Sequence, residues 1–287
     1  MHPQERRRRL DVLLPTSYAD ETPHLREKTL RIGFLGRALA IFRVDTLYLY
    51  DEDRSTSYAK PGNLVKGLMD YMNTAPYLRR RLFPLTSAFR YAGVLPPLNI
   101  PTHPSAEEEP QTYPQVREGL VVEGGRRPLV EIGFERRVTV KRAPGEGSRV
   151  LVRLERRGEK VKARVVSKRK TRLYSGFSTH IFRKDLEDLV GRYELSVATS
   201  RRGSPIRERS SEVSSALKGS RSVCVAFGSA RQGMYEIARN QGFDLDSVFT
   251  YVLNTVPDQG VKTVRTEEAV YATLSQVTLL EELAESG

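Results

Sequence analysis

The chain has 287 residues, 39% of them hydrophobic, which suffices for about two globular domains with sizeable cores. No apolar run approaches the roughly 18 to 20 residues that a membrane-spanning helix needs. The first ten residues, MHPQERRRRL, carry four consecutive arginines with no apolar stretch behind them, so we expect a solvated tail and not a secretory signal.

The formal net charge of +12 is concentrated in one segment of the chain. Residues 136–172 hold 15 Lys and Arg against 3 Asp and Glu, so this segment carries the whole excess. A polyanion such as nucleic acid is the natural partner of such a segment. The alternatives are a solvated charged face or the arginine-rich surface of a thermophilic protein. We favour nucleic acid because thermophile surfaces mix charges of both signs.

The first part of the chain predicts alternating strands and helices. LDVLLP (10–15) is typical of a buried strand, and TLYLYDED (46–53) predicts a second one. Between them we expect a helix that begins near Thr22-Pro23, with Thr22 as its cap. One face of that helix should hold Leu35, Ala38, Leu39 and Phe42. Two short helices should follow between 61 and 83, with Leu64, Leu68 and Met72 on one face.

The middle of the chain changes character. PLVEIGF, RVTV, RVLVRL and KARVVS alternate with period two around glycine-rich turns, so about 115 to 178 is expected to be all-β. The proline-rich stretch 96–114 marks one crossing into this region. We expect an α/β domain in two parts, 1–98 and 179–287, interrupted at 99–178 by a basic, OB-like barrel that binds RNA. Tyr174 and Phe177 could stack on bases, although core packing is the commoner use of aromatic rings.

Three segments of unusual composition end three apolar strands of the last part. They are ATSRRGSP (198–205), FGSARQG (227–233) and NTVPDQGVKTVRTEEA (254–269). Ligands of open α/β sheets bind beyond the carboxyl ends of the strands, so we expect a small-molecule site there, and three ordinary turns are the alternative. Gly203, Gly228 and Gly260 would let the backbone approach the ligand closely.

Familiar ligand motifs are missing from these segments. FGSARQG has neither the Gly-Lys-Ser/Thr ending of a phosphate-binding loop nor the G-x-G-x-x-G pattern. The four histidines are scattered and Cys224 is the single cysteine, so the sequence predicts no metal site. One cysteine also excludes an internal disulfide, and we therefore expect an intracellular, cytoplasmic protein with Cys224 as a small buried side chain.

The stretches SVCVAFGSARQG, NTVPDQGVKTVRTEEA and LSVATSRRGSP resemble the motifs of the SPOUT superfamily of RNA methyltransferases. The resemblance is to its archaeal and eukaryotic branch, which carries a β-barrel inserted in the catalytic domain. It covers most of the chain, from LDVLLPTSYADETP through REGLVVEG and YSGFSTHIF to the end. The pattern P-x-Q-x-x-x-T-V-R-T-E-E-A is the most specific part. Related proteins often carry an acid at the position of Arg201.

The resemblance implies a SPOUT-type α/β fold with a C-terminal trefoil knot, a homodimer, and S-adenosylmethionine bound by the three segments. It implies cofactor contacts at Thr199, Ser200, Gly228, Ser229, Leu253, Asn254, Pro257, Gln259, Gly260, Thr263, Val264 and Thr266. A cap of the final helix, with Glu267 and Glu268 in its first turn, is the alternative role of Thr266.

The expected activity is methylation of ribosomal or transfer RNA without a metal. Arg202 and Arg265 are the catalytic candidates, because a guanidinium favours the anion of a base such as uridine N3. Both could instead hold RNA phosphates, and the acceptor could be a ribose 2′-hydroxyl. The RNA-binding candidates on the barrel are Arg156, Arg157, Lys168, Arg169 and Lys170. A non-catalytic RNA-binding or assembly protein on the same fold is the competing hypothesis.

Overall fold

The computed structural model describes residues 3–52, 59–104, 113–158 and 160–286. The chain divides into two compact units, which we call the sheet unit and the barrel unit. The sheet unit comprises residues 6–70, 88–96 and 177–287, and the barrel unit comprises residues 1–5, 71–87 and 97–176. The domain boundaries inferred from the sequence stay a prediction.

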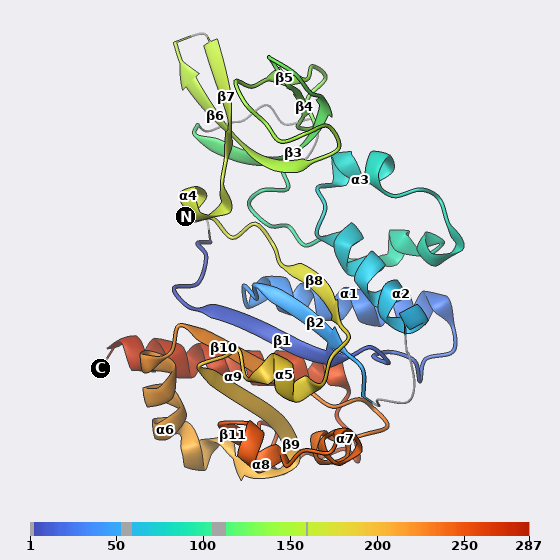
Figure 1. Cartoon of the computed structure of the whole chain (residues 1–287), viewed down its shortest axis with the longest axis vertical. Helices are drawn as coiled ribbons and strands as arrows, with labels where there is room; N and C mark the ends of the chain where they lie inside the picture. Colours follow the sequence, from blue (N-terminus) through green and yellow to red (C-terminus); the bar gives the residue numbers. More distant parts are fainter. Residues whose placement is uncertain (1–2, 53–58, 105–112, 159, 287) are drawn as a thin grey trace. The chain divides into compact units, whose positions relative to one another are not determined.

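A parallel sheet forms the centre of the sheet unit (Figure 1). Within the described residues its strand order is β11-β9-β10-β1-β2-β8, and each neighbouring pair is parallel. This arrangement confirms the α/β fold class. The strands are β1 (Arg9–Pro15), β2 (Thr46–Tyr50), β8 (Ser178–Phe182), β9 (Leu195–Pro205), β10 (Ser222–Ala226) and β11 (Tyr251–Asn254).

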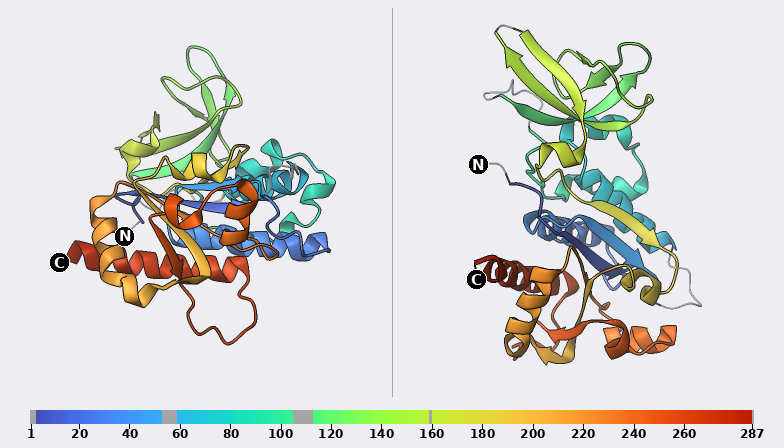
Figure 2. Two further views of the ribbon diagram at one scale, coloured as in Figure 1. Left: turned by 60° about the horizontal axis from the view of Figure 1, so that its bottom comes forward. Right: turned by 60° about the vertical axis from the view of Figure 1, so that its left-hand side comes forward.

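Helices cover both faces of this sheet, so its central strands are apolar on both sides. Leu13, Cys224 and Ala226 pack on one face against α5, α7 and α8. The helices α1, α6 and α9 pack against one another on the opposite face (Figure 2). Their bounds are α1 (Leu25–Ile41), α5 (Leu186–Val190), α6 (Ile206–Gly219), α7 (Met234–Gln241), α8 (Leu245–Val248) and α9 (Thr266–Ser286). In the described part of the chain, no helix is long and apolar enough to span a membrane.

The beginning of the sheet unit departs from two expectations. Helix α1 begins at Leu25 with His24 at its N-cap, so the start predicted near Thr22-Pro23 lies two residues too early and Thr22 is not the cap. The arginine run is no solvated tail. Arg6 is buried in a salt bridge with Glu281 of α9, and Arg8 lies 3.1 Å from the same carboxylate. Burial lowers the pKa of Arg6 to about 10, with further lowering by the charge of Arg43.

The barrel unit contains a five-stranded antiparallel sheet that curls into a nearly closed barrel, with the order β5-β4-β3-β6-β7 among the described residues (Figure 2). Its interior is filled by alternate strand residues such as Val130, Val152 and Leu154. The strands are β3 (Gln115–Glu123), β4 (Leu129–Glu131), β5 (Val138–Thr139), β6 (Arg149–Arg157) and β7 (Lys160–Val166). The inserted barrel is therefore confirmed as a nearly closed sheet.

Short helices accompany the barrel. Helix α3 (Pro76–Leu82) packs Leu78 against Leu120 of β3, and α4 (Lys168–Thr171) interrupts the region expected to be all-β. Helix α2 (Ala59–Met72) and the 3-10 turns η1 (Ser87–Phe89) and η2 (Ala92–Val94) complete the chain. Tyr174 and Phe177 are both buried, so core packing, and not base stacking, is their role.

Candidate functional site

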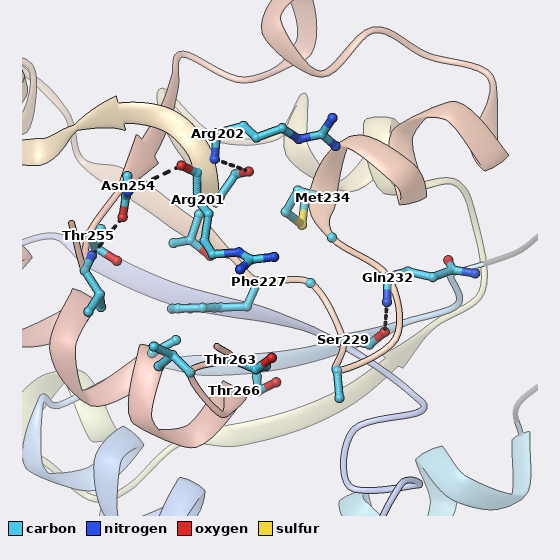
Figure 3. Close-up of a pocket in the computed structure, with 18 of the residues that line it drawn as sticks. Arg201, Arg202, Phe227, Ser229, Gln232, Met234, Asn254, Thr255, Thr263 and Thr266 are labelled. Carbon is cyan, nitrogen blue, oxygen red and sulfur yellow. Dashed lines mark hydrogen bonds between the residues drawn. The ribbon is translucent and has the colours of Figure 1, made fainter. Parts of the chain in front are cut away.

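A cavity of about 640 Å³ opens at the carboxyl ends of β9, β10 and β11 (Figure 3). Its wall is built from the three segments that the sequence singles out, so their predicted convergence is confirmed. The lining residues are Thr199–Arg202, Phe227–Met234, Glu236, Asn254–Val256, Gln259, Thr263, Val264, Thr266 and Ala269. Ligand pockets in proteins have volumes of about 300 to 1,000 Å³, so this one suits a molecule of nucleoside size.

The first segment is a bulge inside a strand and not a loop after one. Val252 of β11 pairs with Ala198, but the next residue, Leu253, pairs with Ser204. The five residues 199–203 are therefore pushed out of the ladder and carry Arg201 and Arg202 over the cavity (Figure 3). Gly203 ends the bulge, where a Cβ would lie 2.6 Å from the carbonyl oxygen of Val252.

The second segment is a tight turn stabilised by its own hydrogen bonds. The Ser229 hydroxyl accepts the backbone N–H of Gln232 at 3.0 Å, and the Ser229 N–H donates to the Gln232 carbonyl at 2.9 Å. A Cβ on Gly228 would lie 2.7 Å from that same carbonyl oxygen. Protein backbone thus packs closely on Gly203 and Gly228, and the expectation that these glycines also let the backbone approach a ligand stays a prediction. A Cβ on Gly260 would meet no atom within 4 Å among the described residues.

The third segment is anchored to α9. The hydroxyls of Thr255 and Thr273 lie 2.7 Å apart, and the amide of Gln276 donates to the Thr255 carbonyl at 2.6 Å. Thr255 and Thr273 are buried, so each hydroxyl depends on the other for its hydrogen bond. The chain leaves β11 in a turn in which Asn254 Oδ1 accepts the Val256 N–H at 3.1 Å. The start of the segment is therefore held by contacts with the body of the sheet unit.

Arg201 connects the first segment to the third. Its carbonyl accepts a hydrogen bond from Asn254 Nδ2 at 3.3 Å, and its guanidinium donates to the Lys262 carbonyl at 3.0 Å. Gln259 Nε2 donates to the same Lys262 carbonyl at 3.2 Å. The Arg201 side chain thus joins two walls of the cavity.

Arg202 has a different environment from its neighbour. Its guanidinium carbon lies 4.7 Å from the ring centroid of Tyr235 on α7, a cation–π contact. Its backbone N–H donates to Ser200 Oγ at 3.2 Å. Within the described part of the chain, no acceptor bonds the guanidinium nitrogens. Arg202 therefore keeps its donors available at the cavity.

The buried floor of the cavity is apolar. Phe227 and Met234 are both about 0 to 1% exposed, and Phe227 follows directly after β10. The Phe227 backbone is fixed on both sides, because its N–H donates to Leu13 and its carbonyl accepts the Tyr50 hydroxyl at 2.7 Å. The floor can therefore hold a flat apolar group while the rim supplies hydrogen bonds.

Most of the predicted cofactor residues line the cavity, and four predicted residues do not. Leu253 is buried in β11, whereas Pro257, Gly260 and Arg265 lie outside the lining. The lining includes Thr199, Ser200, Gly228, Ser229, Asn254, Gln259, Thr263, Val264 and Thr266, together with the catalytic candidate Arg202. Sequence reasoning missed Phe227, Met234 and Tyr235, whose apolar spacing is that of ordinary core residues.

The start of α9 also differs from expectation. Arg265, and not Thr266, is the N-cap, because its carbonyl accepts the Ala269 N–H and its own N–H donates to Glu268 at 2.9 Å. Glu267 is buried and bonds Arg31 through both carboxylate oxygens, at 2.9 and 3.0 Å. Thr266 is therefore not the cap of α9, and it lines the cavity.

Titratable groups near the cavity give little sign of metal chemistry. Cys224 is buried and its pKa is raised by burial, so its thiol stays neutral. Among the described residues, no cluster of three or more His, Cys, Asp or Glu side chains could hold a metal ion. The polar groups that face the cavity are hydroxyls, amides, backbone groups, guanidinium groups and the carboxylate of Glu236, which accepts the Gly233 N–H at 2.9 Å.

Basic side chains gather on the β6–β7 hairpin and on α4 of the barrel unit. Arg153 and Arg164 stand opposite each other, and the Glu155 carboxylate lies 3.0 Å and 2.8 Å from them. Arg156, Lys162, Arg169 and Lys170 are exposed to solvent, whereas Lys168 donates to the Gly176 carbonyl at 3.2 Å. For Arg157 the structure describes only the backbone, in β6. Lys168 therefore has a structural contact that the other exposed cations lack.

A buried ionic cluster holds the barrel to its flanking segments. Glu118 of β3 accepts the Ala75 N–H at 2.6 Å and lies 3.1 Å from His103 Nε2, and it forms a salt bridge with Arg149. Burial alone would raise the pKa of Glu118, but the hydrogen bond from His103 and the charge of Arg149 outweigh it and lower the pKa. Burial lowers the pKa of His103.

Comparison with known families identifies the family to which the chain belongs. The chain combines a parallel α/β sheet, a polar-rimmed cavity at the carboxyl edge of that sheet and an inserted antiparallel barrel. Residues 9–277 match the family described as "Putative RNA methyltransferase". The chain belongs to this family of RNA methyltransferases.

Relatives of known sequence agree with this assignment. An uncharacterised protein of Halobacterium salinarum is 34% identical over 94% of this chain and 99% of its own length. A second haloarchaeal protein, from Haloarcula marismortui, is 32% identical over the same shares of both chains. The human 28S rRNA (uridine-N(3))-methyltransferase is 30% identical over 93% of this chain and 77% of its own length. The similarity therefore spans both units.

Proposed function

We propose that this protein transfers a methyl group from S-adenosylmethionine to N3 of a uridine in ribosomal RNA. The observation that carries the proposal is the cavity at the edge of β9, β10 and β11, which three motif segments build together. Family membership supports the methyl transfer, and the named activity of the human relative supports the acceptor atom. That name favours the base over the ribose 2′-hydroxyl, and ribosomal over transfer RNA.

The groups around the cavity fit the proposed cofactor. Phe227 and Met234 offer an apolar floor for the adenine ring, and the hydroxyls of Thr199, Thr263 and Thr266 can bond ribose. Arg201 and Arg231 also line the cavity and can attract the carboxylate of the cofactor. When bound, S-adenosylmethionine supplies an electrophilic methyl group on a positively charged sulfur. Leu253, Pro257 and Gly260, which lie outside the lining, remain proposed cofactor contacts, and Arg265 remains a proposed catalytic residue.

Alignment and charge are the tasks left to the protein. The acceptor nitrogen would first lose its N–H proton to solvent. It would then take the methyl carbon, and sulfur would keep the electron pair of the broken carbon–sulfur bond. The cavity walls keep the two reactants aligned and shield them from solvent. The free guanidinium donors of Arg202 stabilise the negative charge that develops on the uracil oxygens.

The barrel is proposed as the RNA-docking surface. Arg156, Arg157, Lys168, Arg169 and Lys170 belong to the segment that carries the whole excess charge of the chain. Those of them with described side chains are exposed or half-exposed, as a phosphate-binding surface requires. The barrel would then bind the phosphates of the RNA backbone, while methyl transfer takes place at the cavity.

We also propose a homodimer and a trefoil knot in the C-terminal region. Helix α1 exposes Leu30, Phe34 and Ile41, and α9 exposes Leu279 and Leu283. Exposed apolar side chains on two helices that pack together suit a subunit interface. Light scattering should give twice the chain mass of 32.5 kDa. A monomer that binds the cofactor tightly would argue against the dimer.

Isothermal titration of S-adenosylmethionine, followed by single-turnover methylation of ribosomal RNA, tests the function. We expect binding of one molecule per chain and a methyl group on N3 of one uridine. Thr263→Val and Thr266→Val, which remove hydroxyls at the rim, should weaken binding, and the exposed Thr139→Val on the barrel serves as the control. Gly228→Val is unsuitable, because its side chain would collide with the Gln232 carbonyl. No binding by the wild-type protein would refute the proposal.

A further inference from the structure

Tyr235 and Asp246 hold the Arg202 guanidinium in place. The Tyr235 ring lies under the guanidinium, 4.7 Å from centroid to carbon, and its hydroxyl donates to Asp246 Oδ1 at 3.2 Å. Tyr235 belongs to α7 and Asp246 to α8, which pack on each other. Three side chains from three elements, β9, α7 and α8, therefore form one chain of contacts that ends at the cavity.

The contact fixes Arg202 without using its hydrogen bonds. An arginine that is held by hydrogen bonds or ion pairs has N–H donors occupied. Arg201 is held in this way, because its guanidinium donates to the Lys262 carbonyl. Arg202 is instead positioned by stacking, which leaves its planar fork of donors available. In the described part of the chain, no carboxylate lies within 4 Å of that guanidinium. The Arg202 guanidinium is therefore already oriented, and its N–H donors are available to bind an anionic acceptor base.

Asp246 strengthens this arrangement in two ways. Its hydrogen bond fixes the rotation of the Tyr235 ring, and a phenol that donates to a carboxylate has a more electron-rich ring for a cation to stack on. The tyrosine itself keeps its proton, because burial and then the charge and hydrogen bond of Asp246 raise its pKa. Arg202 and Asp244 are the other charged groups that act on it.

We propose that Tyr235, held by Asp246, is a positioning residue that presents the Arg202 guanidinium to the anionic face of the acceptor base. The inference rests on the proposed methyl transfer and adds two residues outside the motif segments. It predicts that Tyr235 matters for turnover through Arg202, and that it matters little for cofactor binding. Its contribution should vanish once Arg202 is removed.

A double-variant cycle measures this dependence. Tyr235→Leu should lower the single-turnover rate by roughly tenfold, and Arg202→Ala by roughly a hundredfold. The double variant should lose roughly a hundredfold and not a thousandfold, because Tyr235 has nothing left to position. Tyr235→Phe, which keeps the ring and loses the bond to Asp246, should fall between wild type and Tyr235→Leu. Cofactor affinity should stay within about threefold in all four proteins.

Tyr91→Leu is a matched control, because it removes a ring that stacks under Arg90, 5.5 Å away, outside the cavity lining. Its turnover should equal that of wild type. A readout independent of activity is the NMR resonance of the Arg202 Nε–H group, which the ring should shift upfield in wild type and in Tyr235→Phe. The shift should disappear in Tyr235→Leu.

Three results would overturn the inference. They are full turnover in Tyr235→Leu, an additive loss in the double variant, and an Arg202 resonance that the ring does not shift. If Tyr235→Leu unfolds, the turnover of Tyr235→Phe and the Arg202 Nε–H resonance of the wild-type protein still test the inference. A wild-type protein that binds no cofactor and transfers no methyl group refutes the proposed function, and this inference with it. If the wild-type protein is active and Tyr235→Leu has the same turnover, only this inference is refuted and the proposed function stands.

Discussion

The cavity and the basic barrel face differ in how their residues are held. Arg201, Asn254 and Thr255 at the cavity are bonded to named partners, and the backbone around them is fixed. The cations Arg156, Arg169 and Lys170 on the barrel are exposed, and none of the described residues pairs with them. A bonded wall suits a reaction that needs fixed geometry, while unpaired surface cations suit a polyanion whose phosphates can shift. The two regions should therefore respond to different perturbations.

The largest effect is expected from Arg202→Ala. It removes a cavity guanidinium whose donors are free among the described residues, so we expect the methyl-transfer rate to fall by roughly a hundredfold. The affinity for RNA and its salt dependence should change little, because one surface contact among many is lost. Single-turnover rates and filter binding on the same RNA measure both. An equal loss of RNA affinity would mean that Arg202 only holds a phosphate.

Substitutions on the barrel should weaken RNA binding and leave cofactor binding unchanged. Replacing Arg156, Arg169 and Lys170 by Gln should lower RNA affinity roughly a hundredfold near physiological salt, and the log–log salt slope should fall by about 0.7 to 0.9 per lost phosphate contact. Lys168 is left in place because it bonds Gly176. Cofactor affinity should not change.

The control for the barrel variant removes the same charge from the sheet unit. Arg183, Lys218 and Arg221 are exposed cations outside the cavity lining, and their replacement by Gln should leave the salt slope nearly unchanged. An unchanged slope in the barrel variant, or an equal drop in the control, would remove the barrel as the docking surface.

A smaller effect is expected from the anchor of the third segment. Thr255→Val leaves the buried Thr273 hydroxyl without its partner, which costs about 1 to 3 kcal/mol. We expect calorimetry to show a roughly tenfold loss of cofactor affinity as residues 255–264 loosen. The double variant Thr255→Val with Thr273→Val removes both hydroxyls and should recover much of the loss. Failure to recover would assign the effect to Thr255 itself.

The smallest expected effect is the pH dependence of stability. The pKa values of His103 and Glu118 are lowered in the folded barrel unit, so the unfolded chain binds more protons. Their contribution is present above the unfolded pKa values and is lost as the pH falls through the folded ones. The free energy of unfolding should thus fall below about pH 6.5.

The sheet unit contains a buried acid, Asp11, whose pKa shift has the opposite direction to that of Glu118. Burial raises the pKa of Asp11, so its protonation favours the folded state as the pH falls. His103→Gln should flatten the acid limb of the stability profile, measured by urea unfolding between pH 7 and 5. His24→Gln, at the exposed start of α1, should leave the limb unchanged. An unaltered slope in His103→Gln would show that the cluster does not set it.

The sequence by itself determined the local structure and the composition of the site. Period-two alternation placed the barrel strands, continuous apolar runs placed β1, β9 and β10, and charge counting located the basic surface, because these signals lie in neighbouring residues. The three cavity segments were also found from sequence, since the carboxyl ends of parallel strands share one edge.

Tertiary structure decided what depends on residues far apart in the chain. The register shift opposite Val252 turned an expected loop into a bulge, and the Val252 backbone lies close against Gly203. Arg6 and Arg8 of the arginine run became buried because Glu281, near the other end of the chain, lies beside them, whereas Arg7 stays exposed. Tyr235 follows the same pattern. Its spacing is that of a core residue, and only the packing of α7 beside the β9 bulge brings its ring under Arg202.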